Sequence, residues 1–137
     1  MVFKLIIAVM VALLTYAIVV QLNDADMLFW TAMYGVSVIT SVGAFMNLPL
    51  RPMLWVAFGL YAAAVVFYSP SFAYTSLEAF ASVGMSGEEQ ERVRELWGMV
   101  VCLLWTGILI IHDMLKFPLI EYEDDFDDAD VDDVLCN

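Results

Sequence analysis

Residues 5–20 decide the fold, because they read LIIAVMVALLTYAIVV, a run that contains no charged side chain. A helix needs roughly 20 mostly apolar residues to cross the hydrocarbon core of a bilayer. The apolar run extends from about Phe3 to Gln21 and meets that length. Its apolar residues occupy every face, whereas a strand of a membrane barrel alternates apolar and polar residues. We therefore predict a transmembrane helix here.

Three more stretches of the same kind follow along the chain, and they cover about residues 27–47, 52–68 and 96–115. Continuous apolar runs favour helices in lipid, because a helix satisfies its backbone hydrogen bonds internally. The predicted fold class is all-α. Residues 1–116 form a four-helix transmembrane bundle, and residues 117–137 form an acidic C-terminal tail.

The overall composition also indicates an integral membrane protein. Of the 137 residues, 63% are hydrophobic and 16% are charged, and the mean hydropathy is +0.83. A soluble domain is about 45–50% apolar and about 25% charged. Only five Lys and Arg residues stand against 17 Asp and Glu residues, which argues against binding to nucleic acid. Membrane lipids and other membrane protein subunits are the expected partners.

Basic residues near the span ends predict the orientation in the membrane. Four spans place both termini on one side, together with Lys4, Arg51 and Lys116, while Arg92 and Arg94 lie on the other side. Because basic residues are enriched on the cytoplasmic side, we expect both termini to face the cytoplasm or its organellar equivalent. An organellar inner membrane or a bacterial plasma membrane is the favoured location.

A dense group of polar residues lies in the turn between the first two spans. This turn holds Gln21, Asn23, Asp24 and Asp26. Hard cations prefer oxygen ligands of this kind, so one hypothesis is a site for a small cation or a lipid headgroup on the side away from the termini. The alternative is structural, with Asn and Asp capping the second helix while Gln21 bonds across the turn.

The spans themselves offer few groups for chemistry. No span interior holds an Asp, Glu, Lys or Arg, the residues that mark ion paths and proton relays in membranes. His112 is the only histidine, so it cannot supply a two-histidine haem site. The chain contains no hydrolase, phosphate-loop or zinc-ligand spacing. We expect no enzyme activity, no cofactor and no bound metal.

Small and aromatic residues predict how the helices pack. Small residues let membrane helices approach closely, so we expect these to face the bundle interior: Gly35, Ser37, Ser41, Gly43, Gly59, Ala62, Ala63, Gly98, Thr106 and Gly107. Trp30, Trp55 and Trp97 lie near span ends, where tryptophan prefers the headgroup level. Trp105 lies in the middle of a span and is expected to pack against another helix or to contact a partner.

The acidic tail carries most of the net charge. Residues 117–137 hold nine acids and no base, and so contribute -9 of the formal net charge of -12. Such a run is usually a solvated segment. The apolar residues among the acids support a second interpretation equally well, a segment that docks on a basic patch of a partner. The candidate contact residues are Tyr122, Phe126, Asp127, Asp128, Asp130, Asp132 and Asp133.

Part of the tail imitates the start of a calcium-binding loop. Asp128, Asp130 and Asp132 have the required spacing. The imitation fails because Asp133 stands where the loop needs glycine, and because the chain ends before the twelfth position. The solvated segment and the docking segment both remain open.

The turn after the first span also resembles a known family. The residues Gln21-Leu22-Asn23-Asp24-Ala25-Asp26, followed by Trp30 and Tyr34, are similar to the Gln-x-Asn-Asp-x-Asp turn of the transmembrane protein 220 family. Arg94-Glu95-Leu96 and Gly98 at the start of the last span look similar too. The resemblance covers roughly residues 5–116 and implies a small four-span protein. Family members often have Pro where Ala25 stands, and the family implies no activity.

Two functions are consistent with these observations. The leading prediction is a non-catalytic accessory or structural subunit that packs against a larger membrane complex, such as an energy-converting one. The alternative is a small binding or transport protein that uses the turn from Gln21 to Asp26 for a cation or a lipid headgroup.

Overall fold

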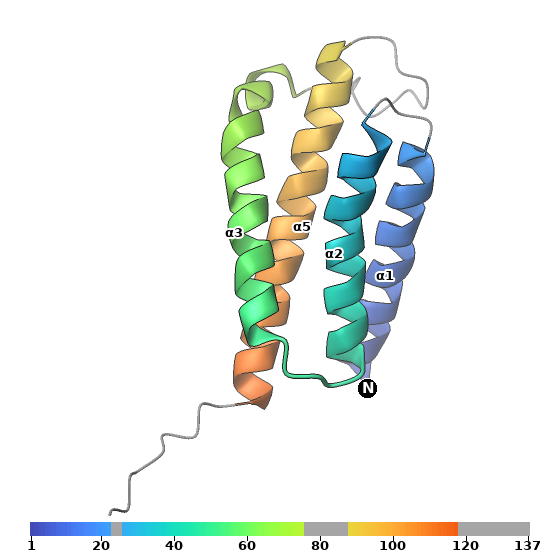
Figure 1. The fold of residues 1–137 in the computed structure, drawn as a ribbon, viewed down its shortest axis with the longest axis vertical. Helices are drawn as coiled ribbons and strands as arrows, with labels where there is room; N and C mark the ends of the chain where they lie inside the picture. The colour runs from blue at the N-terminus through green and yellow to red at the C-terminus, as the bar shows by residue number, and fades with distance from the viewer. Residues whose placement is uncertain (23–25, 76–87, 118–137) are drawn as a thin grey trace, which may run out of the picture.

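The structure is a computed structural model that describes residues 1–22, 26–75 and 88–117. Its elements are α1 (Val2–Gln21), α2 (Met27–Phe45), α3 (Arg51–Tyr68), the 3₁₀ helix η1 (Ser69–Tyr74) and α5 (Glu88–Lys116) (Figure 1). The four α-helices are each long and apolar enough to cross a membrane. No strand occurs in the described ranges. The predicted all-α fold with four transmembrane helices is confirmed.

The two ends of the bundle differ in the chain segments that meet there. The start of α1 and the finish of α5 lie at one end, which we call the termini end (Figure 1). The start of α2, η1 and the start of α5 lie at the opposite end, which we call the turn end (Figure 1).

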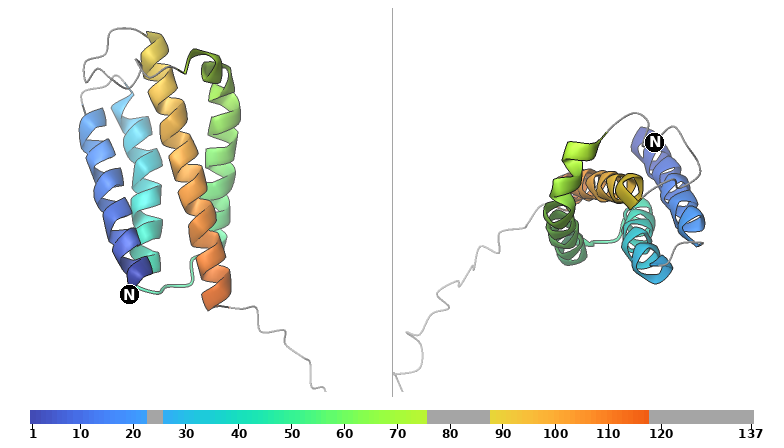
Figure 2. Two further views of the ribbon diagram at one scale, coloured as in Figure 1. Left: turned by 180° about the vertical axis from the view of Figure 1, so that it is seen from behind. Right: turned by 90° about the horizontal axis from the view of Figure 1, so that it is seen from above.

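The helices pair in two sets. α1 packs along α2, and α3 packs along α5. Viewed down the bundle, α5 lies between α3 and α2, and α1 lies beside α2 (Figure 2). Only Ile7 and Leu14 of α1 are buried, so this helix turns most of its apolar surface outward.

The inward face of α5 is one stripe of buried residues. Spacings of four and three residues alternate along the stripe, as in helices of left-handed bundles. The stripe consists of Glu95, Met99, Cys102, Thr106, Leu109 and Asp113. Its middle is apolar or weakly polar and packs against α2 and α3. A carboxylate therefore closes the stripe at each end.

The small residues divide between the interior and the surface. Of the small residues predicted to face inward, four are buried, namely Ser37, Ser41, Gly43 and Thr106. Four more are partly buried, namely Gly35, Ala62, Gly98 and Gly107. The prediction is wrong for Gly59 and Ala63, which are exposed. The reason is that α3 turns the face of Leu54, Ala57 and Tyr61 toward the core, and these two residues lie off that face.

Hydrogen bonds between helices run through the middle of the bundle. The Ser37 and Tyr61 hydroxyl oxygens lie 2.7 Å apart, and the Tyr61 hydroxyl donates to the Met33 carbonyl at 2.7 Å. The Trp105 indole donates to the Ser41 hydroxyl at 2.8 Å, which confirms Trp105 as a packing residue. In lipid, polar contacts of this kind replace the hydrophobic driving force between helices. They connect α2 to both α3 and α5.

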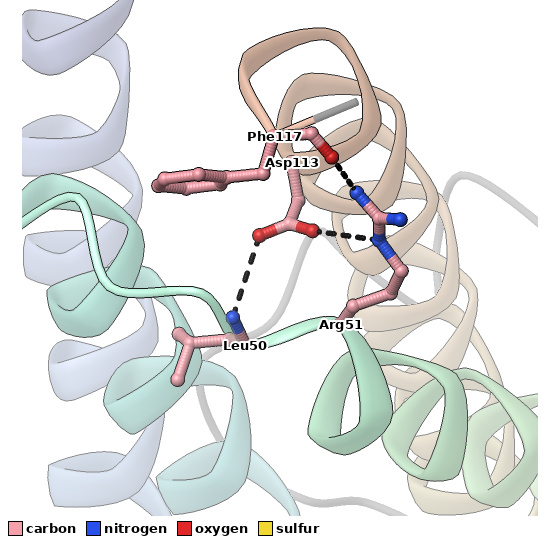
Figure 3. A network of polar contacts seen from close by, with 4 residues as sticks. All are labelled: Leu50, Arg51, Asp113 and Phe117. Atoms are coloured by element: carbon pink, nitrogen blue, oxygen red, sulfur yellow. Dashed lines mark hydrogen bonds and ion pairs between the residues drawn. The ribbon is translucent and has the colours of Figure 1, made fainter. Parts of the chain in front are cut away.

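A second polar group closes the termini end, where Asp113 joins α5 to the start of α3 (Figure 3). The Arg51 Nε donates to one carboxylate oxygen of Asp113 at 3.1 Å, and the Leu50 amide approaches the other at 3.4 Å. Arg51 also donates to the Phe117 carbonyl. Pro52 stands in the first turn of α3, where a missing N–H leaves no helical bond unmade.

Helix α2 finishes in a compact backbone motif at the same end. Asn47 has a φ of 62°, the left-handed conformation that typically ends a helix. Its amide donates to the Ala44 carbonyl at 3.1 Å, and the Leu48 amide donates to the Gly43 carbonyl at 3.0 Å. These two bonds form a Schellman motif, with Asn in the place that Gly commonly takes. The Asn47 side chain accepts a hydrogen bond from Lys116.

Candidate functional site

The turn end of the bundle contains an open cleft of about 550 Å³. Three elements line this acidic cleft: the residue that precedes α2, the junction of α3 with η1, and the first described turns of α5. The lining residues are Asp26, Phe67, Tyr68, Pro70, Ser71, Glu91, Arg92 and Glu95. The cleft lies at the level where the chain leaves the spans, because its residues belong to span ends.

Glu95 is the most deeply placed charged group in the acidic cleft. Its side chain is 8% exposed, and it accepts a hydrogen bond from the Trp30 side chain. Glu95 is buried because it continues the inward stripe of α5, one turn before Met99. A carboxylate in this position is costly unless hydrogen bonds or a counter-charge compensate for lost water.

Trp30 forms the inner wall behind Glu95. We expected this residue at the headgroup level, and that expectation is wrong because the side chain is only 1% exposed. Its ring centroid lies 6.0 Å from that of Tyr68 and 6.1 Å from that of Tyr34. The reason is the length of α5, whose first turns extend along the start of α2 and cover Trp30. Trp55 and Trp97 are exposed, so their placement at the headgroup level stays a prediction.

The acidic cleft carries more negative than positive charge. Asp26, Glu91 and Glu95 supply three carboxylates, and Arg92 supplies one guanidinium. Asp26 is the N-cap residue of α2, but its side chain makes no capping hydrogen bond. Its carboxylate is exposed. The described lining therefore has an excess of two negative charges, with aromatic rings beside them.

The predicted turn site is only partly within the described residues. Gln21 is half-buried at the end of α1, and Asp26 lines the acidic cleft. Asn23 and Asp24, which we expected to cap α2, lie outside the described residues, and Asp26 is the N-cap instead. The contact candidates of the tail also lie outside the described residues: Tyr122, Phe126, Asp127, Asp128, Asp130, Asp132 and Asp133.

Three charged residues of the acidic cleft were not predicted from the sequence, namely Glu91, Arg92 and Glu95. The hydropathy pattern assigns this segment to water or headgroups, and so gives no sign that the Glu95 carboxylate turns inward. A signal for Glu95 exists in the spacing of the last span. Counting back in steps of three and four from Thr106 through Cys102 and Met99 leads to Glu95.

The part of the chain that the structure describes contains no cluster of side chains suited to bind a metal ion. No three His, Cys, Asp or Glu residues of that part lie close enough to hold a metal ion. His112 lies at the other end of the bundle, where its ring stacks on Phe3 with centroids 4.1 Å apart. This contact gives His112 a packing role.

Comparison with known proteins yields one match. The family model described as "Transmembrane family 220, helix" matches residues 13–111. The matched segment covers more than half of the chain and includes all or part of each α-helix. Searches of curated proteins and of solved structures found no match.

Proposed function

The chain belongs to transmembrane family 220, and from this premise we propose that it is a non-enzymatic, multi-pass membrane protein that binds the ammonium group of a phospholipid headgroup in the acidic cleft. The observation that carries the proposal is the buried carboxylate of Glu95 in the wall of a cleft of about 550 Å³. The sequence suggested a cation or headgroup site in the turn from Gln21 to Asp26, and the proposed ligand would lie beside Asp26 of that turn.

An ammonium group suits the charge of the acidic cleft. Trp30 gives Glu95 one neutral hydrogen bond, whereas a buried carboxylate is stabilised best by a cation. Asp26 and Glu91 strengthen the attraction for a cation, and Arg92 offsets only one of these charges. A ligand that brings one positive charge therefore compensates the buried carboxylate.

The other lining residues favour an organic ammonium on a phosphate headgroup. Phe67 and Tyr68 offer aromatic faces, and a cation over such a face gains about 0.5–2 kcal/mol. Arg92 lines the same cleft and can pair with the phosphate of the same headgroup. The cleft lies at the ends of spans, which is where headgroups are found. These features favour a zwitterionic phospholipid over a free amine.

Lipid-dependent thermal unfolding of the purified protein in detergent tests the proposal. Phosphatidylethanolamine and phosphatidylcholine should raise the unfolding temperature of the wild type. The soluble headgroup phosphoethanolamine, which lacks acyl chains, should do so only weakly. Glu95→Gln should abolish the effect of both lipids, because the amide removes the buried negative charge while keeping the shape.

Asp113→Asn is the matched control for Glu95→Gln. It removes the same charge from a similarly buried position on the same stripe, but at the termini end. We expect this variant to unfold at a lower temperature and still to gain stability from the zwitterionic lipids. Equal lipid effects in the wild type and Glu95→Gln would refute the proposal.

A second proposal keeps the role of accessory subunit, and the outer face of α1 supports it. Exposed apolar residues form a continuous stripe along this helix: Leu5, Val9, Leu13, Tyr16 and Val20. The Tyr16 side chain is 68% exposed within a span. A neighbouring membrane subunit can accept a hydrogen bond from this hydroxyl, which hydrocarbon cannot do. The acidic tail then serves to dock on a basic patch of the same partner.

Native electrophoresis of gently solubilised membranes tests this second proposal. We expect migration in a complex much larger than 15.4 kDa, the mass of the chain. A photoreactive residue in place of Leu13 should crosslink to the partner, while one in place of Val66 on the exposed side of α3 serves as the control. Migration only as the free chain, without a crosslink at Leu13, would contradict this role.

A further inference from the structure

A basic cleft lies at the termini end, opposite the acidic cleft, and has a volume of about 390 Å³. The first turns of α1, the end of α2 and the last turns of α5 enclose it. Its lining residues are Met1, Phe3, Lys4, Ile7, Ala44, Asn47, His112 and Lys116. Neither the proposed headgroup binding nor the proposed role of accessory subunit uses this cleft.

The basic cleft exists because α1 and α5 stand apart. Among the described residues, no Cα of α1 lies within 8 Å of a Cα of α5. The Phe3 ring bridges the two helices, with its centroid 4.1 Å from that of His112 and 6.3 Å from that of Trp105. Phe3 thus forms one wall, and the space beside it remains open.

Two cations mark the mouth of the basic cleft. Lys116 donates to the Asn47 side chain across the opening, and the Lys4 ammonium lies 5.0 Å from the centroid of the Phe45 ring. No acidic residue is among the described residues that line the cleft. The nearby carboxylate of Asp113 is engaged by Arg51 and the Leu50 amide.

The inner part of the basic cleft is apolar. Ile7 is 1% exposed and stands one turn after Phe3 on the same face of α1. Ala44 closes the opposite wall from α2. A cationic mouth at a span end that leads to an apolar interior matches a phosphate group with an attached acyl chain, whereas a free phosphate would use only the mouth.

We propose that the basic cleft is a specific site for one anionic phospholipid, whose phosphate lies between Lys4 and Lys116 and whose acyl chain follows Phe3 and Ile7. The lipid fills the space between α1 and α5, and so ties α1 to the rest of the bundle. The site is independent of the acidic cleft, because the two differ in the sign of their charge and lie at opposite ends.

Native mass spectrometry of the full-length protein, released from detergent with defined lipids, tests the site. With phosphatidylglycerol as the probe, the wild type should retain one lipid molecule more strongly than the variant Lys4→Gln/Lys116→Gln. Two lysines near a membrane surface predict roughly thirtyfold weaker retention in the variant. Lys4→Arg/Lys116→Arg should restore most of the retention, because the arginines keep the charge.

Controls separate the site from general attraction. Arg94→Gln removes a positive charge at the turn end and should leave phosphatidylglycerol retention unchanged. Phosphatidylcholine should be retained less than phosphatidylglycerol by the wild type, and inorganic phosphate should not displace the lipid. Glu95→Gln, which tests the acidic cleft, should not alter retention here, so the two proposals can fail separately.

Three results would overturn the inference. The first is equal retention of phosphatidylglycerol by the wild type and by Lys4→Gln/Lys116→Gln. The second is displacement of the lipid by inorganic phosphate, which would leave a simple anion site. The third is stronger retention after all acids of residues 118–137 are changed to their amides, which would assign the basic cleft to the chain's own acidic tail.

Discussion

Glu95 and Asp113 lie on the same inward stripe of α5, 18 residues and five helical turns apart, and both are buried. Their separation along the helix axis is about 27 Å at 1.5 Å per residue, close to the thickness of the hydrocarbon core of about 30 Å. The two carboxylates thus mark both boundaries of the apolar layer from the inside. Each accepts a hydrogen bond from a different helix, since Trp30 belongs to α2 and Arg51 to α3.

The ion pair at the termini end should contribute measurably to stability. Asp113→Ala removes the partner of Arg51 and the acceptor of the Leu50 amide, so we expect a loss of about 2–3 kcal/mol in the free energy of unfolding. Asp113→Asn keeps an acceptor for the amide and should lose less. Denaturant unfolding in mixed detergent micelles measures both values. Equal stability of Asp113→Ala and the wild type would show that the pair contributes nothing.

The bond between Trp105 and Ser41 should couple α5 to α2. A double-mutant cycle with Trp105→Phe and Ser41→Ala should give a coupling energy of about 0.6 kcal/mol, and at most about 1.7 kcal/mol, as for other hydrogen bonds between membrane helices. Thr15 bonds within its own helix on the exposed face of α1. The pair Thr15→Ala and Trp105→Phe is therefore the control, and its coupling should be zero within error.

Two glycines form a matched pair for testing the packing of α2 on α5. A Cβ added at Gly98 would collide with the Tyr34 hydroxyl, whereas one added at Gly35 would meet no atom within 4 Å. Gly98→Ala should therefore destabilise the protein by about 1–3 kcal/mol. Gly35→Ala should leave stability unchanged or slightly higher, because alanine is the better helix former. Unfolding curves recorded under one set of conditions distinguish the two. The reverse order would disprove the close approach of Tyr34 to Gly98.

The orientation can be measured with the chain's own cysteines. Cys102 is buried, and Cys136 is the only other cysteine of the chain. If the termini face the cytoplasm or its equivalent, a membrane-impermeant maleimide should label Cys136 only after the membrane is permeabilised. Ala73→Cys in a Cys136→Ser background places a thiol at the turn end and should be labelled without permeabilisation. The opposite labelling pattern would reverse the predicted orientation.

The positions of the spans were predictable because hydropathy depends on the local sequence alone. The faces of the helices were harder to predict, since a helix that is apolar all round gives no sign of which side meets its neighbour. Residues 54, 57 and 61 of α3 turn inward, while Gly59, which looked suited to close packing, does not. In lipid, either face is equally well solvated, so the choice depends on the fit between helices.

The location of the candidate site could be predicted from the sequence, but most of the residues that line it could not. Asp26 was identified because polar residues gather in one turn, a local signal. Glu95 was missed because its burial depends on where α5 meets Trp30, which is a tertiary property. The contact of α5 with Trp30 also explains why the prediction for Trp30 was wrong. Its position near a span end suggested a headgroup contact. Interfacial preference of tryptophan applies only where no other helix covers the ring.

The pairing of α1 with α2 and of α3 with α5 has a consequence for biosynthesis. The ribosome completes the first helical hairpin well before α5 exists, yet α5 carries the partners that bury Trp30, Tyr34 and Ser41. Until the last span is inserted, the part of α2 that α5 covers meets lipid or an insertion factor. The bundle is therefore complete only when α5 enters between α2 and α3, which are already in the membrane.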